Sequence, residues 1–116
     1  MTNEECLFCK IINKEVSCDL IYEDNDVIAF RDINPQAPVH ILVIPKRHIS
    51  TLLEIKDEDK ELIGKIFLVI NEIAYKEGIA QDGFRVIANC NRLSGQAIFH
   101  MHFHILGGRR LSWPPG

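Results

Sequence analysis

The sequence predicts an α+β domain in which a mostly antiparallel sheet of about five strands packs against one long helix. Short β-rich segments separated by turn residues come first along the chain, and an amphipathic helical pattern follows them. Two more strand patterns come after the helix. Strands on both sides of a single helix, joined by hairpin-length turns, favour antiparallel pairing over repeated parallel crossovers.

The size and composition of the chain restrict the classes of protein it can represent. It has 116 residues, 47% hydrophobic and 25% charged, which predicts one globular domain over residues 1–116 with a core that needs no disulfide bonds. No apolar segment reaches the length of a membrane span, and no signal peptide is recognisable. The net charge of −3, without a basic cluster, argues against nucleic-acid binding. We therefore expect a cytoplasmic protein.

The first strands are predicted from turn chemistry and apolar runs. Residues 20–22 and 27–30 flank a polar turn at 23–26, which is typical of a hairpin. A loop with two prolines at 34–38 follows. Residues 39–44 are almost wholly apolar and stop at a proline, so they are expected to form a buried strand with a histidine near its start.

One long helix is predicted between Asp57, as the N-cap, and Gly78, at the C-terminal end. Leu68 and Val69 widen its apolar surface, which hints at a partner on a second side. The residues expected on the buried face follow i, i+3, i+4 spacing: Leu62, Ile63, Ile66, Phe67, Ile70, Ile73 and Ala74.

The last two strands are predicted at 84–88 and 98–106, with a polar stretch at 89–96 between them. His100, His102 and His104 alternate with apolar residues in the final strand, so the three imidazoles are expected on one face. The apolar residues between and after them are expected to face the core beneath the helix: Met101, Phe103 and Ile105.

Three interpretations of this histidine row are open. The imidazoles are polar side chains on a solvated face, ligands of a catalytic metal, or groups of a nucleophilic site. Alternate side chains stand ~6.6 Å apart and the outer pair ~13 Å, so all three cannot share one ion without a bend, although two of them with His40 could. Nucleophilic catalysis fits best, because one imidazole can attack while another stabilises the developing charge.

The segment 100–106, HMHFHIL, has the form His-φ-His-φ-His-φ-φ, where φ is apolar, and resembles the histidine-triad (HIT) family. The similarity is greatest to its Hint branch of purine nucleoside phosphoramidases. Further matching segments run in order along nearly the whole chain: FCKII at 8–12, AFRDINPQAP at 29–38, VIPKRHIS at 43–50, GGRR at 107–110 and WPPG at 113–116.

The resemblance implies a HIT-like fold with a short N-terminal helix, dimerising into a continuous sheet. It also implies hydrolysis of purine nucleoside phosphoramidates, which releases a nucleoside monophosphate and an amine through a nucleotidyl-histidine. By motif position His102 is the nucleophile, and His104 contacts the phosphate and assists the leaving amine. His40 and His100 support His102. No cofactor is implied for this chemistry.

Substrate contacts carry over by the same resemblance. Asp32 matches the residue that binds the ribose hydroxyls, and Asn89 with Gly95 and Gln96 matches the phosphate-side loop. Trp113 belongs to a tail that reaches the partner's site in this branch. The apolar walls around the purine match Phe8, Ile11, Phe30 and Ile33.

One position departs from the pattern. Many Hint-like enzymes have a hydroxyl residue near the leaving group where this chain has Ala97. A missing donor there costs on the order of 1–3 kcal/mol of transition-state stabilisation. The departure keeps open a nucleotide-binding module with little turnover, and a nucleotidyl transferase is a further alternative.

A zinc site is predicted near the N-terminus. Cys6 and Cys9 have the spacing of half a zinc knuckle. By resemblance to bacterial relatives, His48 and His100 complete a closed Cys2His2 site with a structural role. The alternative is a pair of free thiols, with His48 hydrogen-bonded to His100. A redox pair is disfavoured because no βαβ pattern surrounds the cysteines.

Overall fold

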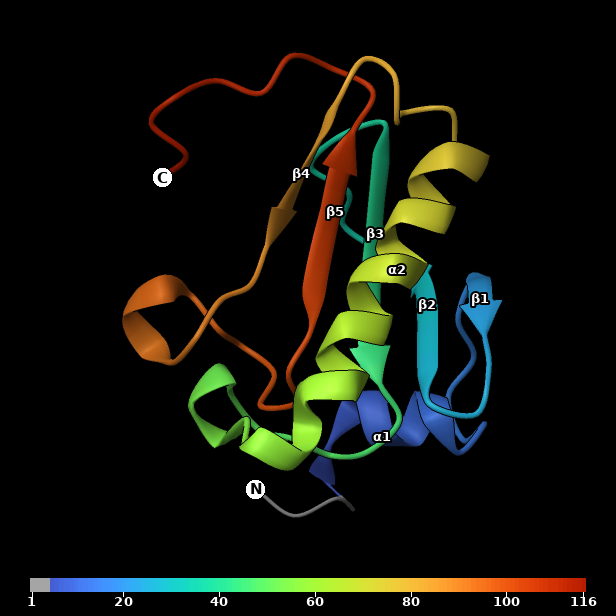
Figure 1. The fold of residues 1–116 in the computed structure, drawn as a ribbon, viewed down its shortest axis with the longest axis vertical. Helices are drawn as coiled ribbons and strands as arrows, with labels where there is room; N and C mark the ends of the chain where they lie inside the picture. The colour runs from blue at the N-terminus through green and yellow to red at the C-terminus, as the bar shows by residue number, and fades with distance from the viewer. Residues whose placement is uncertain (1–4) are drawn as a thin grey trace.

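The computed structural model describes residues 5–116, which form a five-stranded sheet in the order β1-β2-β3-β5-β4 with every neighbouring pair antiparallel (Figure 1). The α+β class, the long helix and the short N-terminal helix are confirmed. None of the helices in residues 5–116 has the length and apolar character needed to cross a membrane. The elements are α1 (Leu7–Ile12), β1 (Leu20–Glu23), β2 (Val27–Arg31), β3 (Val39–Pro45), η2 (Leu52–Glu54), η3 (Asp57–Asp59), α2 (Lys60–Lys76), β4 (Phe84–Ile87), η4 (Arg92–Ser94) and β5 (Phe103–Gly107).

The central strands are apolar at nearly every position because both faces of the sheet are covered. On β3, Ile41 and Val43 join the core beneath α2, whereas Leu42 and Ile44 join a second core with α1. A strand covered on both sides has no solvent-facing positions, so it reads as a continuous apolar run. The histidine row lies on the α1 side, because Met101 and its alternate neighbours face α2 as expected.

The expected last strand is shorter than its sequence pattern. Residues 98–102 are irregular, and β5 begins at Phe103, which pairs with Val43. Just before β5, the main-chain N–H of Met101 donates to the carbonyl of Ile49 at 2.6 Å and not to a carbonyl of strand β3. Of the three histidines in the row, only His104 therefore belongs to a strand, although the alternation of faces continues through the irregular segment.

The predicted N-cap of the long helix was wrong. Asp57 begins a single 3₁₀ turn, and α2 begins at Lys60. Asp59 is buried, accepts a hydrogen bond from the Lys56 N–H at 2.8 Å and pairs with Arg47, so this carboxylate organises the start of the helix. At the other end Gly78 has φ of 74°, as a helix-terminating glycine requires.

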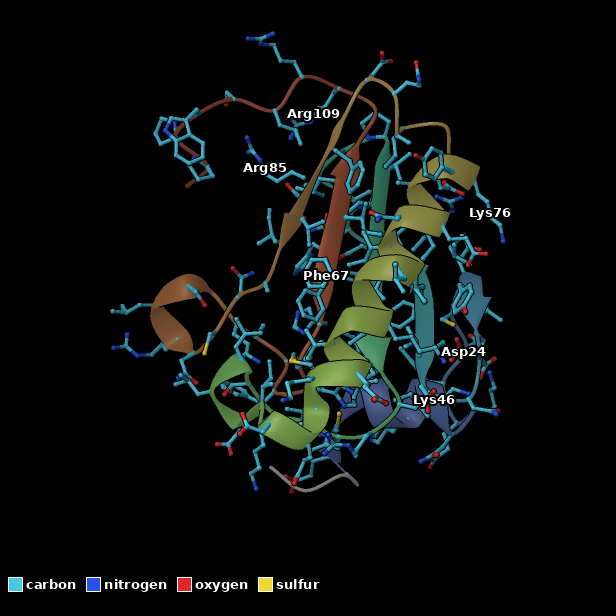
Figure 2. The ribbon with its side chains drawn as sticks, in the orientation of Figure 1. Asp24, Lys46, Phe67, Lys76, Arg85 and Arg109 are labelled. Carbon is cyan, nitrogen blue, oxygen red and sulfur yellow. The ribbon has the colours of Figure 1, made fainter. Side chains whose placement is uncertain are left out.

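The expected helix face is only partly buried. Four of the residues predicted there are buried: Ile66, Ile70, Ile73 and Ala74. Phe67 lies between α2 and the sheet in Figure 2, with its ring 5.5 Å from that of Phe103, yet it is 44% exposed. Leu68 is 70% exposed, whereas Val69 is buried. Leu68, beside Tyr22 of β1, and Phe67, beside Phe103 of β5, thus leave apolar surface uncovered on two different sides of α2.

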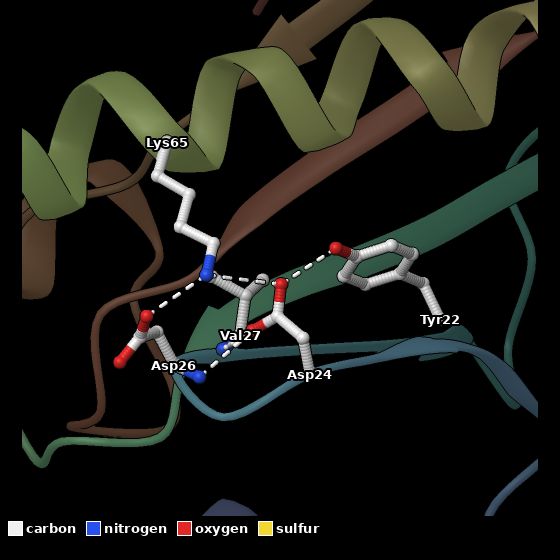
Figure 3. A network of polar contacts seen from close by, with 5 residues as sticks. All are labelled: Tyr22, Asp24, Asp26, Val27 and Lys65. Atoms are coloured by element: carbon white, nitrogen blue, oxygen red, sulfur yellow. Dashed lines mark hydrogen bonds and ion pairs between the residues drawn. The ribbon is translucent and has the colours of Figure 1, made fainter.

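The β1–β2 hairpin is joined to α2 through Asp24 (Figure 3). Its carboxylate accepts hydrogen bonds from the Tyr22 hydroxyl and from the N–H groups of Asp26 and Val27, and it pairs with Lys65 of α2 at 3.1 Å. Burial alone would raise the pKa of Asp24, but these donors outweigh it and hold the pKa far below its ordinary value.

Replacing Asp24 by alanine is expected to lower the free energy of unfolding by about 1–3 kcal/mol, because several hydrogen-bond donors lose their shared acceptor at once. Asp26→Ala is the matched control, since among residues 5–116 that more exposed carboxylate accepts only from Lys65. We expect it to change stability by at most about 0.5 kcal/mol. Urea unfolding of both variants makes the comparison, and equal losses would contradict the proposed importance of Asp24.

Candidate active site and metal centre

An apolar pocket of about 280 Å³ lies where α1 meets the end of β2. Phe8 lines it and also contacts His102, with ring centroids 5.1 Å apart, so the pocket adjoins the histidine row. Ile33 stands at the pocket with its side chain fully exposed. The lining includes the four apolar residues expected from the sequence, together with Asp32, which was also expected there. The remaining lining residues were not expected: Leu7, Val16, Ser17, Cys18, Arg31, Leu42 and Ile98.

The ring of His102 is oriented by the main chain. Its Nδ1 lies 2.7 Å from the carbonyl oxygen of His100. A carbonyl can only accept, so Nδ1 carries the hydrogen and Nε2 carries the lone pair in the neutral ring. Burial lowers the pKa of His102, which favours this neutral form. The support expected from His100 thus comes from its main-chain carbonyl rather than from its ring.

His40 contacts His104 and not His102. The Gln36 N–H donates to Nδ1 of His40 at 3.0 Å, so a neutral His40 carries its hydrogen on Nε2. That nitrogen lies 2.9 Å from Nδ1 of His104 and 3.4 Å from Oδ2 of Asp32. His40 therefore donates to His104, whose own hydrogen is left on Nε2.

This hydrogen-bond pattern disfavours the metal-site alternative that involves His40. Asp32, His40 and His104 have donor atoms close enough together to hold an ion. A ligating histidine, however, normally donates from its second ring nitrogen, whereas the second nitrogen of His40 accepts from Gln36. Asp32 Oδ1 in turn accepts from the Asn34 N–H at 2.8 Å, and the carboxylate lies at the pocket wall.

A second cluster brings together the four predicted metal ligands. Cys6, Cys9, His48 and His100 have their ligand atoms within 4.8 Å of one another. Nδ1 of His48 lies 3.1 Å from Nδ1 of His100, and the sulfurs lie 3.3–3.5 Å from these nitrogens. Such separations are close to the edges of a tetrahedron with Zn–N of about 2.0 Å and Zn–S of about 2.3 Å.

The surroundings of this cluster suit a metal ion. His100 donates from Nε2 to the carbonyl of Pro45 at 2.7 Å, which directs the lone pair of Nδ1 to the sulfurs. Burial is the main cause that lowers the pKa of His100 to about 4. The bond to Pro45 opposes the shift and the neighbouring histidines add to it, so the ring is a neutral ligand. Burial and then Cys6 raise the pKa of the Cys9 thiol to about 12, so a cation is needed to stabilise a thiolate there.

The phosphate-side loop is held by one of its own predicted residues. Gln96 is buried, and its side chain accepts from the Asn91 N–H at 2.7 Å and donates to the Ser50 carbonyl at 2.9 Å. These bonds shape the loop that carries Gly95, which has φ of 90°, and the exposed Ala97. A substrate contact by the Gln96 side chain, or by the half-buried Asn89, stays a prediction.

Trp113 lies far from the pocket in this chain. Its side chain is 81% exposed, and the tail before it is held by Arg85, which donates to the Ser112 carbonyl at 3.0 Å. Figure 1 shows the tail at the opposite end of the sheet from α1. Any contact of Trp113 with substrate would have to be made in another copy of the chain. Two main-chain groups that orient histidines, the Gln36 N–H and the Pro45 carbonyl, have no sequence signal.

Comparison with known proteins identifies the family. The HIT domain family model matches residues 13–111. The purine nucleoside phosphoramidase of Escherichia coli K12 is 49% identical over 108 residues, which cover 93% of this chain and 91% of that protein. A HIT family hydrolase from Legionella pneumophila Philadelphia 1 has a TM-score of 0.95 at 46% identity, covering 97% of this chain and all of the other. A histidine triad protein from Clostridium difficile has a TM-score of 0.92 at 47% identity, covering 97% of each chain. With its histidine row, sheet order and sequence all in agreement, the chain belongs to the HIT domain family.

Proposed function

We propose that the protein hydrolyses purine nucleoside phosphoramidates, with His102 as the nucleophile. The observation that carries the proposal is the 2.7 Å contact between His102 Nδ1 and the His100 carbonyl, which leaves the Nε2 lone pair available for attack. The Escherichia coli relative with purine nucleoside phosphoramidase activity in its name supports the substrate class.

The pocket beside His102 supports a nucleoside as the bound group. Phe8, Ile11 and Phe30 offer apolar and aromatic walls to a flat base. Asp32 has one oxygen near His40 and lies in the same lining, where a carboxylate suits the two hydroxyls of a ribose. A nucleotide placed this way brings its α-phosphate towards the histidine row, because the base wall Phe8 also touches His102.

The proposed reaction has two displacements at phosphorus. First, Nε2 of His102 forms a bond to the α-phosphorus, the P–N bond to the amine breaks, and the amine leaves with a proton from water. The Nδ1–H bond to the His100 carbonyl supports the positive charge that this places on the ring. Water then attacks phosphorus, the bond to His102 breaks, and the ring returns to its neutral form. The proton lost by the attacking water replaces the one that the amine took from solvent in the first step.

His104 is proposed to stabilise charge on the phosphoryl group. Its Nδ1 accepts from His40, so Nε2–H is available to a phosphoryl oxygen. His104 and His102 have ring centroids 5.1 Å apart, which allows both rings to contact one phosphate. The catalytic arrangement thus needs no metal at phosphorus.

The direct test is release of AMP and amine from adenosine 5′-phosphoramidate by the native protein. Steady turnover with water as the acceptor supports the proposed hydrolase. Tight AMP binding without turnover would instead establish the nucleotide-binding module that Ala97 keeps open. Transfer of the nucleotide to phosphate or a sugar phosphate in preference to water would establish the transferase.

We further propose that Cys6, Cys9, His48 and His100 hold a structural zinc ion. A Cys2His2 set has no open coordination position, so the ion would supply no catalytic water. Its role would be to join α1 and the segment before β5, which carries the carbonyl that orients His102.

We also propose that the single domain of residues 1–116 forms a homodimer through the edge strand β4. All four residues of β4 are only half-buried, and the strand lies at the end of the sheet order. Phe67, at 44% exposure and in contact with Phe103 of the adjacent strand β5, provides apolar surface on the helix near this edge. Sedimentation equilibrium is expected to give twice the mass of the 13.3 kDa chain. A stable monomer at micromolar concentration would contradict the dimer.

A further inference from the structure

The segment after β5 is hydrogen-bonded to and packed against the loop that precedes β3. Arg109, labelled near the end of β5 in Figure 2, donates from Nε and Nη2 to the Gln36 carbonyl at 3.2 and 2.9 Å. Its neighbour Gly108 has φ of 89°, and a Cβ there would lie 2.9 Å from Cβ of Pro38. Arg109 and Gly108 therefore hold the same short turn at two points, and any side chain at 108 would disturb it.

The turn that Arg109 and Gly108 contact carries the group that determines the tautomer of His40. Gln36 presents its carbonyl to Arg109 and its N–H to Nδ1 of His40. His40 then donates from Nε2 to Nδ1 of His104 at 2.9 Å. Hydrogen bonds on both sides of the Gln36 backbone thus link an arginine at the surface to the ring proposed to contact the phosphate.

This arrangement opposes protonation of His104. An imidazolium would carry a hydrogen on Nδ1, and that hydrogen would meet the Nε2–H of His40. The titratable groups facing His104 are His102, His40 and Asp32. Burial, followed by the two histidines, lowers the pKa of His104 to about 4, and Asp32 opposes the shift. A neutral imidazole still donates through Nε2–H.

We propose that Arg109 is a positioning residue that keeps His104 a neutral hydrogen-bond donor, acting through Gln36 and His40. The inference rests on the proposed function, because it assigns a role in the same site. A neutral donor stabilises the charge that grows on phosphoryl oxygens in the transition state. An imidazolium would bind the anionic substrate as strongly as the transition state, whereas a neutral donor binds the transition state more strongly than the substrate.

The test compares Arg109→Ala with Arg110→Ala, a neighbouring arginine whose guanidinium has no part in this set of bonds. Nitrogen NMR on the substrate-free proteins reports the tautomers of His40 and His104 and the pKa of His104. In Arg109→Ala we expect both rings to become tautomer mixtures and the pKa of His104 to rise, while burial still holds it below the ordinary value of about 6.5. The Arg110 variant should match the native protein.

Kinetics provides the second readout. With adenosine 5′-phosphoramidate, Arg109→Ala should lower kcat by about tenfold or more with KM unchanged or lower, because the lost interaction belongs to the transition state. The acid limb of the kcat profile should also move to higher pH. Arg109→Lys, which keeps the charge but not the two-pronged geometry, should fall between native and alanine.

The outcomes separate this inference from the proposed function. Unchanged tautomers of His40 and His104 in Arg109→Ala overturn the inference, whatever the activity. Altered tautomers with no phosphoramidate turnover in the native protein support the positioning role and refute the hydrolase. If the alanine variant does not fold, the same measurements on Arg109→Lys decide, and native tautomers with native kinetics in that variant count against the inference.

Discussion

Replacing His102 by alanine is expected to reduce AMP release from adenosine 5′-phosphoramidate by about a thousandfold or more. The substitution removes the atom that forms the new bond to phosphorus, and no neighbouring ring takes its place. His104 has its lone pair on Nδ1 directed at His40, and His100 has its lone pair directed at the sulfurs of Cys6 and Cys9. Loss of a nucleophile that cannot be substituted costs most of the catalysis.

The matched control is Met101→Leu, which changes the adjacent side chain on the opposite face. Met101 is buried in the core beneath α2, and a replacement of similar volume should leave kcat nearly unchanged. AMP binding by the His102 variant, measured by calorimetry, should persist, because Asp32 and the apolar pocket remain. Residual turnover within about tenfold of native, in a folded His102→Ala protein, would exclude His102 as the nucleophile.

Loss of the metal is expected to produce the largest change in stability. Native protein should contain about one zinc per chain, and removing it should lower the free energy of unfolding by about 4 kcal/mol, if the ion is held at a thousandfold excess over its Kd. The Cys9→Ser variant should lose the zinc and a similar amount of stability. The reason is that the contacts of Cys6 and Cys9 with His48 and His100 hold the start of the chain against residues that lie far along the sequence.

Cys18→Ser is the control, because Cys18 is an exposed free cysteine outside the cluster. It should keep the metal and the native melting temperature. A brief chelator treatment that leaves the protein folded should also leave hydrolysis intact, since the ion is proposed to be structural. Two results together would favour the alternative of two free thiols: native protein that contains no metal, and equal stability of the Cys9→Ser and Cys18→Ser variants.

Local sequence patterns predicted much of this molecule. The β1–β2 hairpin, the buried strand β3, the long helix and its terminating Gly78 follow from turn residues and apolar periodicity. The alternation of histidine with apolar residues placed Met101 on the helix side correctly. Where these predictions failed, contacts that the local pattern does not show were responsible. The first residues of the expected last strand lie beyond its pairing with Val43, and Asp59 rather than Asp57 organises the start of α2.

The sequence by itself determined the family and the fold class and indicated the side chains proposed to react, because residue types at fixed spacing carry that information. Only the tertiary structure decided how each imidazole is oriented and which of its nitrogens carries the hydrogen. The tautomers of His102, His40 and His100 depend on the His100 carbonyl, the Gln36 N–H and the Pro45 carbonyl. Every residue except proline has the same main-chain donor and acceptor, so nothing in the side-chain order reveals which of these groups will face a given ring. That choice is made when the sheet, the loop and the segment after β5 pack together.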